Sequence, residues 1–246
     1  MVASDPTPIR TLFLDAGGVL VFPNWNRVSA ALAARGVDAP PDLLAAGDAR
    51  ARRRIDLAKT VGHTTDRERG WLYFNFVLDE AGVPQDARTD SALDDLQSYH
   101  REWNLWENVP ADVPAALERF KGLGLQTAVV SNANGRLHVL FDRLGLSRHF
   151  DLILDSAVEG LEKPDPRLFR VAIDRLGADP DRTLHLGDFY HVDVVGARAA
   201  GLRAVLLDPA DLYPDADCLR VRSLGELADR LERGDTAWQR VEGPLP

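Results

Sequence analysis

Four short segments of the chain carry polar residues whose types could do chemistry together. They are Asp15 with Gly17-Gly18, Ser131-Asn132, Lys163 before Pro164, and Asp188 followed by Asp193. Carboxylates can act as nucleophiles or hold a hard cation, and an ammonium group can offset the negative charge of a substrate. Only three of the 29 basic residues are lysines, which favours a specific use for Lys163. Each residue also has an ordinary interpretation, because such residues cap helices, form turns or face solvent.

Apolar runs of strand length lie next to these segments. They cover 10–14, 125–130, 152–154, 183–186 and 203–207. The runs are unbroken rather than alternating, which is typical of parallel strands covered on both faces. From Pro110 onward helices and strands alternate, which predicts right-handed crossovers and a doubly wound, Rossmann-like parallel sheet. The ligand crevice of such an α/β sheet lies at the carboxyl ends of its strands, where the four segments are expected.

The stretch between the first strand and the rest of the sheet is helical in pattern. Helices are predicted at 27–35, 41–59, 65–81 and 88–103. We therefore expect an α/β core domain formed by residues 1–23 and 107–246, with a helical bundle of residues 24–106 inserted into it.

Composition limits the function classes. The formal net charge of −9 argues against a nucleic-acid partner. The chain has no apolar run of the roughly 20 residues that a membrane span needs, and its first residues lack an export signal. The single cysteine, Cys218, excludes an internal disulfide and a thiolate metal cluster. We expect a cytoplasmic protein with no membrane partner, and the sequence does not indicate its oligomeric state.

The order and spacing of the four segments resemble those of the haloacid dehalogenase-like hydrolases, a superfamily dominated by phosphatases. From Asp15 it is 116 residues to Ser131, then 32 to Lys163 and 25 to Asp188. The stretches at 160–169 and 187–201 are similar to those of the subfamily that inserts a helical cap after its first motif. The resemblance implies that residues 24–106 form this cap domain.

The resemblance also implies a nucleophile and a metal site. Asp15 would attack phosphorus and form an aspartyl-phosphate. Mg²⁺ would be held by Asp15, the backbone carbonyl of Gly17 and Asp188, with Asp193 acting nearby through water or by positioning the loop. The ordinary interpretation of Asp188 and Asp193 is that they cap the following helix.

Substrate binding is implied at two further segments. Ser131 and the backbone around Asn132 would form hydrogen bonds with the phosphoryl oxygens, and Lys163 would neutralise charge between nucleophile and phosphate. Asp15, Ser131 and Lys163 are therefore the expected catalytic residues. A small phosphorylated metabolite is the expected substrate, because a cap limits access to the site.

Gly17 departs from the family pattern. Most phosphatases of the family carry an Asp there, which protonates the leaving alcohol and then activates water. Three explanations are open. Another group such as His191, Tyr190 or His63 supplies the proton, or the substrate has a good leaving group, as an acyl phosphate does. Alternatively, the protein has lost turnover and binds a phosphorylated ligand.

Two other hydrolase branches also lack that Asp. The 2-haloacid dehalogenases lack it together with the metal site, so Asp188 and Asp193 count against this activity. The phosphonate hydrolases have a small residue there and use a cap lysine as a Schiff base. Lys59 is the one lysine between residues 24 and 106.

Overall fold

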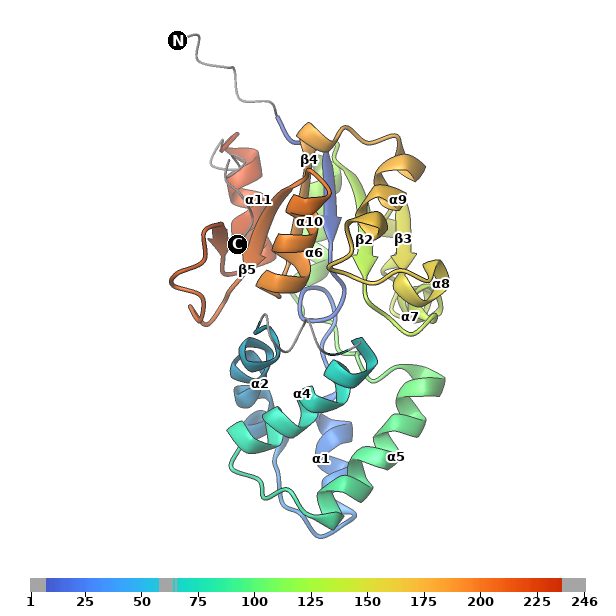
Figure 1. The fold of residues 1–246 in the computed structure, drawn as a ribbon, viewed down its shortest axis with the longest axis vertical. Coiled ribbons are helices and arrows are strands. Elements are labelled where there is room, and N and C mark those ends of the chain that lie inside the picture. The colour runs from blue at the N-terminus through green and yellow to red at the C-terminus, as the bar shows by residue number, and fades with distance from the viewer. Residues whose placement is uncertain (1–7, 58–63, 65, 236–246) are drawn as a thin grey trace. The chain divides into compact units, whose positions relative to one another are not determined.

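The computed structural model describes residues 8–57, 64 and 66–235 (Figure 1). The chain divides into two compact units, Met1–Leu20 with Val109–Pro246, and Val21–Asn108. The first unit holds the strands of the described residues, and the second is built of helices. The boundaries predicted from the sequence, after 23 and after 106, lie a few residues away.

The first unit contains a six-stranded sheet. Its strands are β1 (Thr11–Leu14), β2 (Gln126–Ser131), β3 (Leu152–Asp155), β4 (Thr183–Gly187), β5 (Arg203–Leu207) and β6 (Leu219–Val221). All neighbours run parallel, in the order β3-β2-β1-β4-β5-β6. The strand order reverses at β1, which lies between β2 and β4. The predicted doubly wound parallel sheet is confirmed.

The register of the central strands brings their carboxyl ends level. Leu14 of β1 pairs with Val129 of β2 on one side and with Leu186 of β4 on the other. The backbone N–H of Asp15 then donates to the carbonyl of Leu186 at 2.9 Å. Residues that follow these strands therefore lie at one edge of the sheet, at its topological switch point.

The strands are apolar because both faces of the sheet are covered. Phe13, Val130 and Leu154 are fully buried and pack with Phe169 in one core cluster. This two-sided burial explains the unbroken apolar runs in the sequence. The edge strand β6 was missed, because it has three residues and an arginine at its centre.

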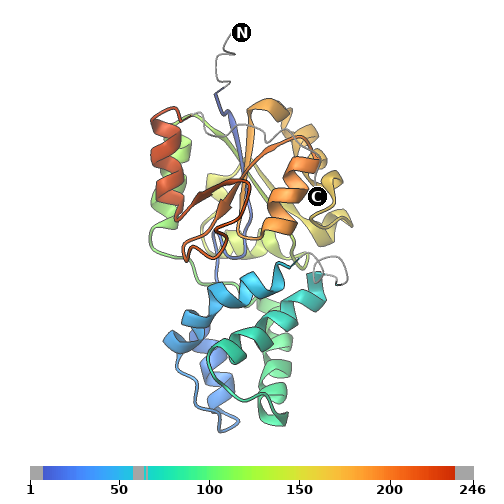
Figure 2. The same cartoon turned by 60° about the vertical axis from the view of Figure 1, so that its left-hand side comes forward.

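Helices cover both faces of the sheet. They are α6 (Val113–Gly122), α7 (Leu137–Arg143), α8 (Ser156–Glu159), α9 (Pro166–Leu176), α10 (Val195–Ala199) and α11 (Leu224–Glu232). Helices α9 and α10 pack together on one face, and α6 and α11 pack together on the other (Figure 2). Short single turns occupy Ser147–His149 and Pro180–Arg182, and a π-helical turn, η3, covers Tyr190–Val194.

The second unit contains four described helices near the predicted ranges. They are α1 (Trp25–Ala33), α2 (Pro41–Ile55), α4 (Asp66–Glu80) and α5 (Ala87–Trp103). Helix α2 packs along α4, and α1 contacts α2 and α5. The predicted helix 41–59 is described only to Ile55, and both Lys59 and His63 lie outside the described residues.

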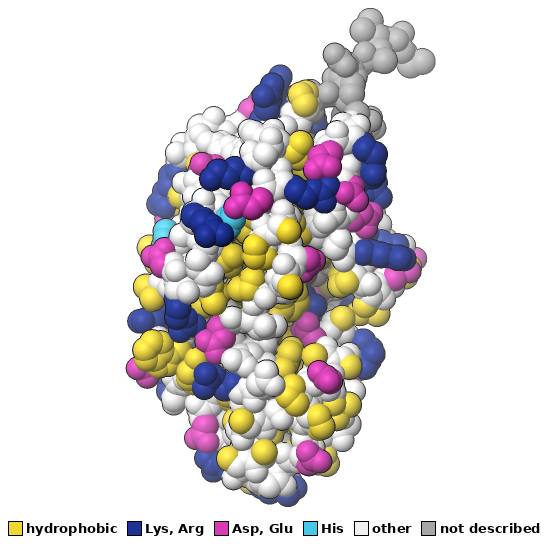
Figure 3. All heavy atoms as spheres, turned by 180° about the vertical axis from the view of Figure 1, so that it is seen from behind, with side chains coloured by type: hydrophobic (Ala, Val, Ile, Leu, Met, Phe, Trp, Pro, Cys, Tyr) yellow, Lys and Arg dark blue, Asp and Glu magenta, His cyan; other side chains and the backbone are white. Residues whose placement is uncertain are grey.

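The many arginines of the second unit pair with acidic residues. Arg52 lies 2.8 Å from Asp48 within α2, and Arg50 lies 2.6 Å from Glu80 of α4. On the face of the molecule in Figure 3, basic side chains are likewise scattered among acidic ones. Within the described ranges, no helix is long and apolar enough to span a bilayer.

Candidate active site

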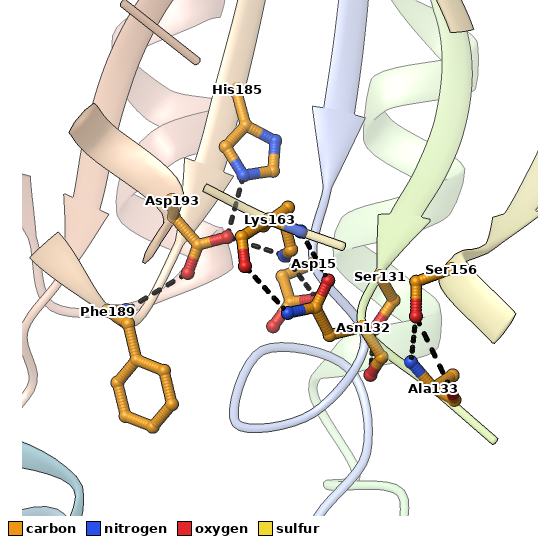
Figure 4. Close-up of polar contacts among 9 residues, drawn as sticks. All are labelled: Asp15, Ser131, Asn132, Ala133, Ser156, Lys163, His185, Phe189 and Asp193. Carbon is orange, nitrogen blue, oxygen red and sulfur yellow. Dashed lines mark hydrogen bonds and ion pairs between the residues drawn. The ribbon is translucent and has the colours of Figure 1, made fainter. Parts of the chain in front are cut away.

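Asp15 lies where β1 ends and is 8% exposed. The Nζ atom of Lys163 donates to its Oδ1 at 2.8 Å (Figure 4). Burial raises the pKa of Asp15 above its usual value, opposed by the charge of Lys163 and a hydrogen bond from Ser131. The carboxyl group predicted to be the nucleophile therefore contacts an ammonium group at the carboxyl edge of the sheet.

Lys163 connects two carboxylates. Its side chain is 1% exposed, and Nζ also donates to Oδ1 of Asp193 at 2.6 Å. Burial alone would lower the pKa of Lys163, but Asp15 and Asp193 outweigh burial and raise it above its usual value. Lys163 is therefore a cation at neutral pH, and it can offset the charge of an anionic substrate only while these contacts position it.

The loop that follows β2 holds the backbone of Lys163. The side chain of Asn132 accepts from the Lys163 N–H at 2.7 Å and donates to the Lys163 carbonyl at 3.0 Å. The Asn132 side-chain amide thus positions the backbone at Lys163. Because the side chain is used in this way, the backbone around Asn132 is the candidate for substrate binding. Ser131 is buried at the end of β2, next to Asp15.

Asp155 fixes the loop after β2, and this role was not predicted from the sequence. Its carboxylate accepts from the N–H groups of Gly135 and Leu137, at 3.0 and 3.1 Å. The hydroxyl of the adjacent Ser156 accepts from the Ala133 N–H at 3.0 Å (Figure 4). An aspartate at the end of a predicted strand was the available signal, but its partners depend on the pairing of β2 with β3.

Three buried carboxylates gather at this edge. Oxygen atoms of Asp15, Asp188 and Asp193 all lie within 4.8 Å of one another. Lys163 contributes one positive charge to the cluster, which carries three negative charges when ionised. Buried excess charge is unfavourable unless it is compensated, and an all-oxygen donor set is what Mg²⁺ prefers. The residues therefore fit a hard divalent cation.

Asp193 is held on three sides. Its Oδ1 contacts Lys163 and lies 3.0 Å from Nε2 of His185, and its Oδ2 accepts from the Phe189 N–H at 3.1 Å. A Cβ atom on Gly187 would lie 2.0 Å from Cγ of Asp193, so this position requires glycine. Burial favours the protonated form of Asp193, but Lys163 and His185 outweigh burial and lower its pKa below the usual range. Asp193 is therefore ionised and fixed beside the lysine.

Comparison with known proteins assigns the family. Residues 9–201 match the family described as haloacid dehalogenase-like hydrolase. The chain belongs to this family. The resemblance inferred from the four segments is confirmed by this match.

Two curated relatives of this chain align over part of their length. The haloacid dehalogenase-like hydrolase domain-containing protein 3 of Bos taurus is 33% identical over 157 residues, covering 61% of this chain and 62% of that protein. The phosphoserine phosphatase of Thermus thermophilus is 36% identical over 162 residues, covering 63% of this chain and 61% of that protein. The chain thus spans less than two thirds of the length of either relative.

Solved structures of similar fold cover more of the chain. The magnesium-bound hydrolase YfnB of Bacillus subtilis gives a TM-score of 0.67 at 20% identity, covering 92% of this chain and 99% of that chain. A structure described as a dehalogenase gives a TM-score of 0.61 at 25% identity, covering 92% of this chain and 97% of that chain.

The chain has Gly17 where the acid/base Asp of the family would stand. Of the three groups considered as replacements, His63 lies outside the described residues. The Tyr190 hydroxyl donates to Asp217 at 2.6 Å, and burial with this contact raises its pKa to about 12. The ring of His191 packs edge-on against Tyr190, at 5.2 Å between ring centroids. The Tyr190 hydroxyl is therefore committed to a partner other than Asp15.

Proposed function

We propose that this hydrolase is a Mg²⁺-dependent phosphatase that acts on a small phosphorylated metabolite through an aspartyl-phosphate at Asp15. The observation that carries the proposal is a buried lysine in contact with Asp15, within a cluster of three carboxylates. A phosphomonoester dianion repels a carboxylate, so the site needs positive charge to bring the two together. The phosphatase named among the relatives supports the reaction class.

In the first step, a carboxylate oxygen of Asp15 attacks phosphorus and the bond to the leaving oxygen breaks. Lys163 holds Asp15 in place and offsets charge on the transferring phosphoryl group. Ser131 and the backbone around Asn132 form hydrogen bonds with the phosphoryl oxygens. In the second step, water attacks phosphorus and the bond between phosphorus and the Asp15 oxygen breaks. Phosphate leaves with the protons of the water, and the Asp15 carboxylate is restored.

The metal site uses the same edge of the sheet. Asp15, the Gly17 carbonyl and Asp188 hold Mg²⁺, while Asp193 stays beside Lys163. When bound, Mg²⁺ supplies positive charge that stabilises the phosphoryl oxygens. The helical residues 24–106 serve as the cap that limits the substrate to small molecules.

Gly17 narrows the substrate class. Without a carboxyl group at this position, no side chain of residue 17 protonates the leaving oxygen. General acid catalysis contributes about 10²–10⁴-fold to such reactions, and a leaving group that is stable as an anion does not need it. We therefore propose that acyl phosphates are better substrates than alkyl phosphates.

The test is phosphate release from a panel of acyl, aryl and alkyl phosphates with Mg²⁺. We expect release to be fastest from acyl phosphates, and to be lost in Asp15→Asn and in the presence of a chelator. No release from any compound would refute the phosphatase assignment. Release that persists in Asp15→Asn would refute the aspartyl-phosphate route.

Gly17→Asp tests the leaving-group argument. Gly17 is partly exposed and, unlike Gly18 with φ of 78°, is not among the glycines with positive φ. An Asp side chain is therefore compatible with its backbone. We expect alkyl phosphates to be cleaved faster, with acyl phosphates little changed. Gly17→Asn is the matched control, since its amide cannot transfer a proton, and equal gains in both variants would contradict the argument.

A 2-haloacid dehalogenase is the second candidate. The 25% identical dehalogenase structure and the missing Asp at Gly17 favour it, and the carboxylate cluster counts against it. Halide release from 2-haloacids, unaffected by a chelator, would support it over the phosphatase. Phosphonate cleavage through Lys59 and ligand binding without turnover remain hypotheses, to be tested by phosphonatase and binding assays if the panel shows no phosphate release.

A further inference from the structure

A buried imidazole lies beside the site but is not used in the mechanism above. His185 is the central residue of β4 and is fully buried. Its ring packs edge-on against Phe169 of α9, at 4.9 Å between centroids. A polar ring in an apolar core is unfavourable unless it forms a hydrogen bond, so the partner of His185 identifies its role.

The partner is Asp193, and the contact places a proton on Nε2. Nε2 of His185 lies 3.0 Å from Oδ1 of Asp193 (Figure 4). Nδ1 is buried and has no hydrogen-bond partner among the described residues. An ionised carboxylate only accepts hydrogen bonds, so Nε2 of His185 carries a proton and donates it to Asp193.

The contact continues to the nucleophile, Asp15, through two residues, Asp193 and Lys163. His185 and Lys163 donate to the same oxygen of Asp193, and Lys163 also donates to Asp15. Without His185, one of the three donors that hold the Asp193 carboxylate is lost. Rotation of that carboxylate would break the 2.6 Å contact that, together with the 2.8 Å contact to Asp15, fixes the position of the lysine ammonium.

We propose that His185 is a positioning residue that orients Asp193 and thereby holds the Lys163 ammonium against Asp15. His185 is fully buried, so it acts through Asp193 and not through contact with a substrate. Removing an outer partner of this kind typically lowers activity about 10–100-fold. The kinetic part of the inference rests on the proposed phosphatase function, whereas the geometry does not.

Two measurements on the metal-free protein test the geometry without activity. Nitrogen NMR of ¹⁵N-histidine-labelled protein, assigned with His185→Gln, should show a protonated Nε2 at His185. An unprotonated Nε2 would overturn the inference. Acylation of lysines, located by mass spectrometry, should label Lys163 slowly relative to the exposed Lys121.

The variants are His185→Leu, which removes the donor, and His185→Gln, which can restore it. His149→Leu is the matched control, because His149 is another buried imidazole in the first unit. The Thr127 hydroxyl, at the opposite end of β2 from Ser131, donates to the His149 carbonyl. We expect His185→Leu to raise Lys163 labelling relative to Lys121, with His185→Gln and His149→Leu close to wild type. Equal labelling in all three variants would overturn the inference.

Kinetics provide the third measurement. His185→Leu should lower kcat about 10–100-fold with a smaller change in KM, and His185→Gln should recover most of kcat. His149→Leu should leave kcat unchanged even where thermal unfolding shows a loss of stability. If the wild-type protein releases no phosphate, the proposed function fails, while the Nε2 proton and the labelling still decide the role of His185.

Discussion

Replacing Lys163 by methionine removes the positive charge between Asp15 and Asp193 and keeps an unbranched side chain. Nζ lies 2.8 and 2.6 Å from the two carboxylate oxygens, and the lysine side chain is 1% exposed. Removing one partner of a buried ion pair typically costs about 3–5 kcal/mol, because the remaining charge stays buried and uncompensated. Losing the contact with Asp15 adds little to this cost. Burial already raises the pKa of Asp15, so its carboxylate can take up a proton when the lysine is absent. We expect Lys163→Met to lower the free energy of unfolding by about 3–5 kcal/mol.

Urea unfolding in the presence of a chelator measures this loss. Circular dichroism is the appropriate signal, because the described tryptophans, at positions 25, 71, 103 and 106, all belong to the other unit. Lys121→Met is the matched control. Lys121 is exposed on α6, so its replacement should change stability by less than about 0.5 kcal/mol. A loss below about 1 kcal/mol in Lys163→Met would refute the buried ion pair, since exposed pairs contribute no more than that.

Three further predictions concern the site and the second unit. Gly187→Ala should displace Asp193, because the new Cβ would lie 2.0 Å from Cγ of Asp193. The free energy of unfolding, measured in urea, should fall by about 1–3 kcal/mol. The control is Gly122→Ala, which meets no atom within 4 Å, and equal losses would contradict the steric argument. Mg²⁺ at 100 times its Kd should stabilise the protein by about 2.7 kcal/mol in thermal unfolding, and much less in Asp188→Asn. A Mg²⁺ shift unchanged in that variant would exclude this residue as a ligand. Burial lowers the pKa of His100 to about 4 from 6.5, so the unfolded state gains its proton first as the pH falls. The free energy of unfolding should therefore fall by about 3 kcal/mol from pH 6.5 to 4. Urea unfolding of His100→Gln should show a smaller fall. The same pH dependence in both proteins would contradict this role of His100.

The sequence alone determined the parallel sheet and the edge at which the site lies. Unbroken apolar runs such as 183–186 identify strands buried on both faces, and buried parallel strands all end at the same edge. The residues that follow them, such as Asp15 and Asp188, can therefore be assigned to one location without knowledge of any contact. The short edge strand β6 escaped this reasoning, because an edge position does not require an apolar run.

The tertiary structure decided which of these residues contact one another. Lys163 meets Asp15 across 148 residues of sequence, and Asn132 holds the Lys163 backbone across 31. His185 reaches Asp193 because β4 presents alternate side chains to opposite faces, and this residue faces α9. A sequence motif specifies the residue types at the ends of strands. The strand pairing and helix packing specify the distances between their side chains, and hydrogen bonds depend on those distances to within a few tenths of an ångström.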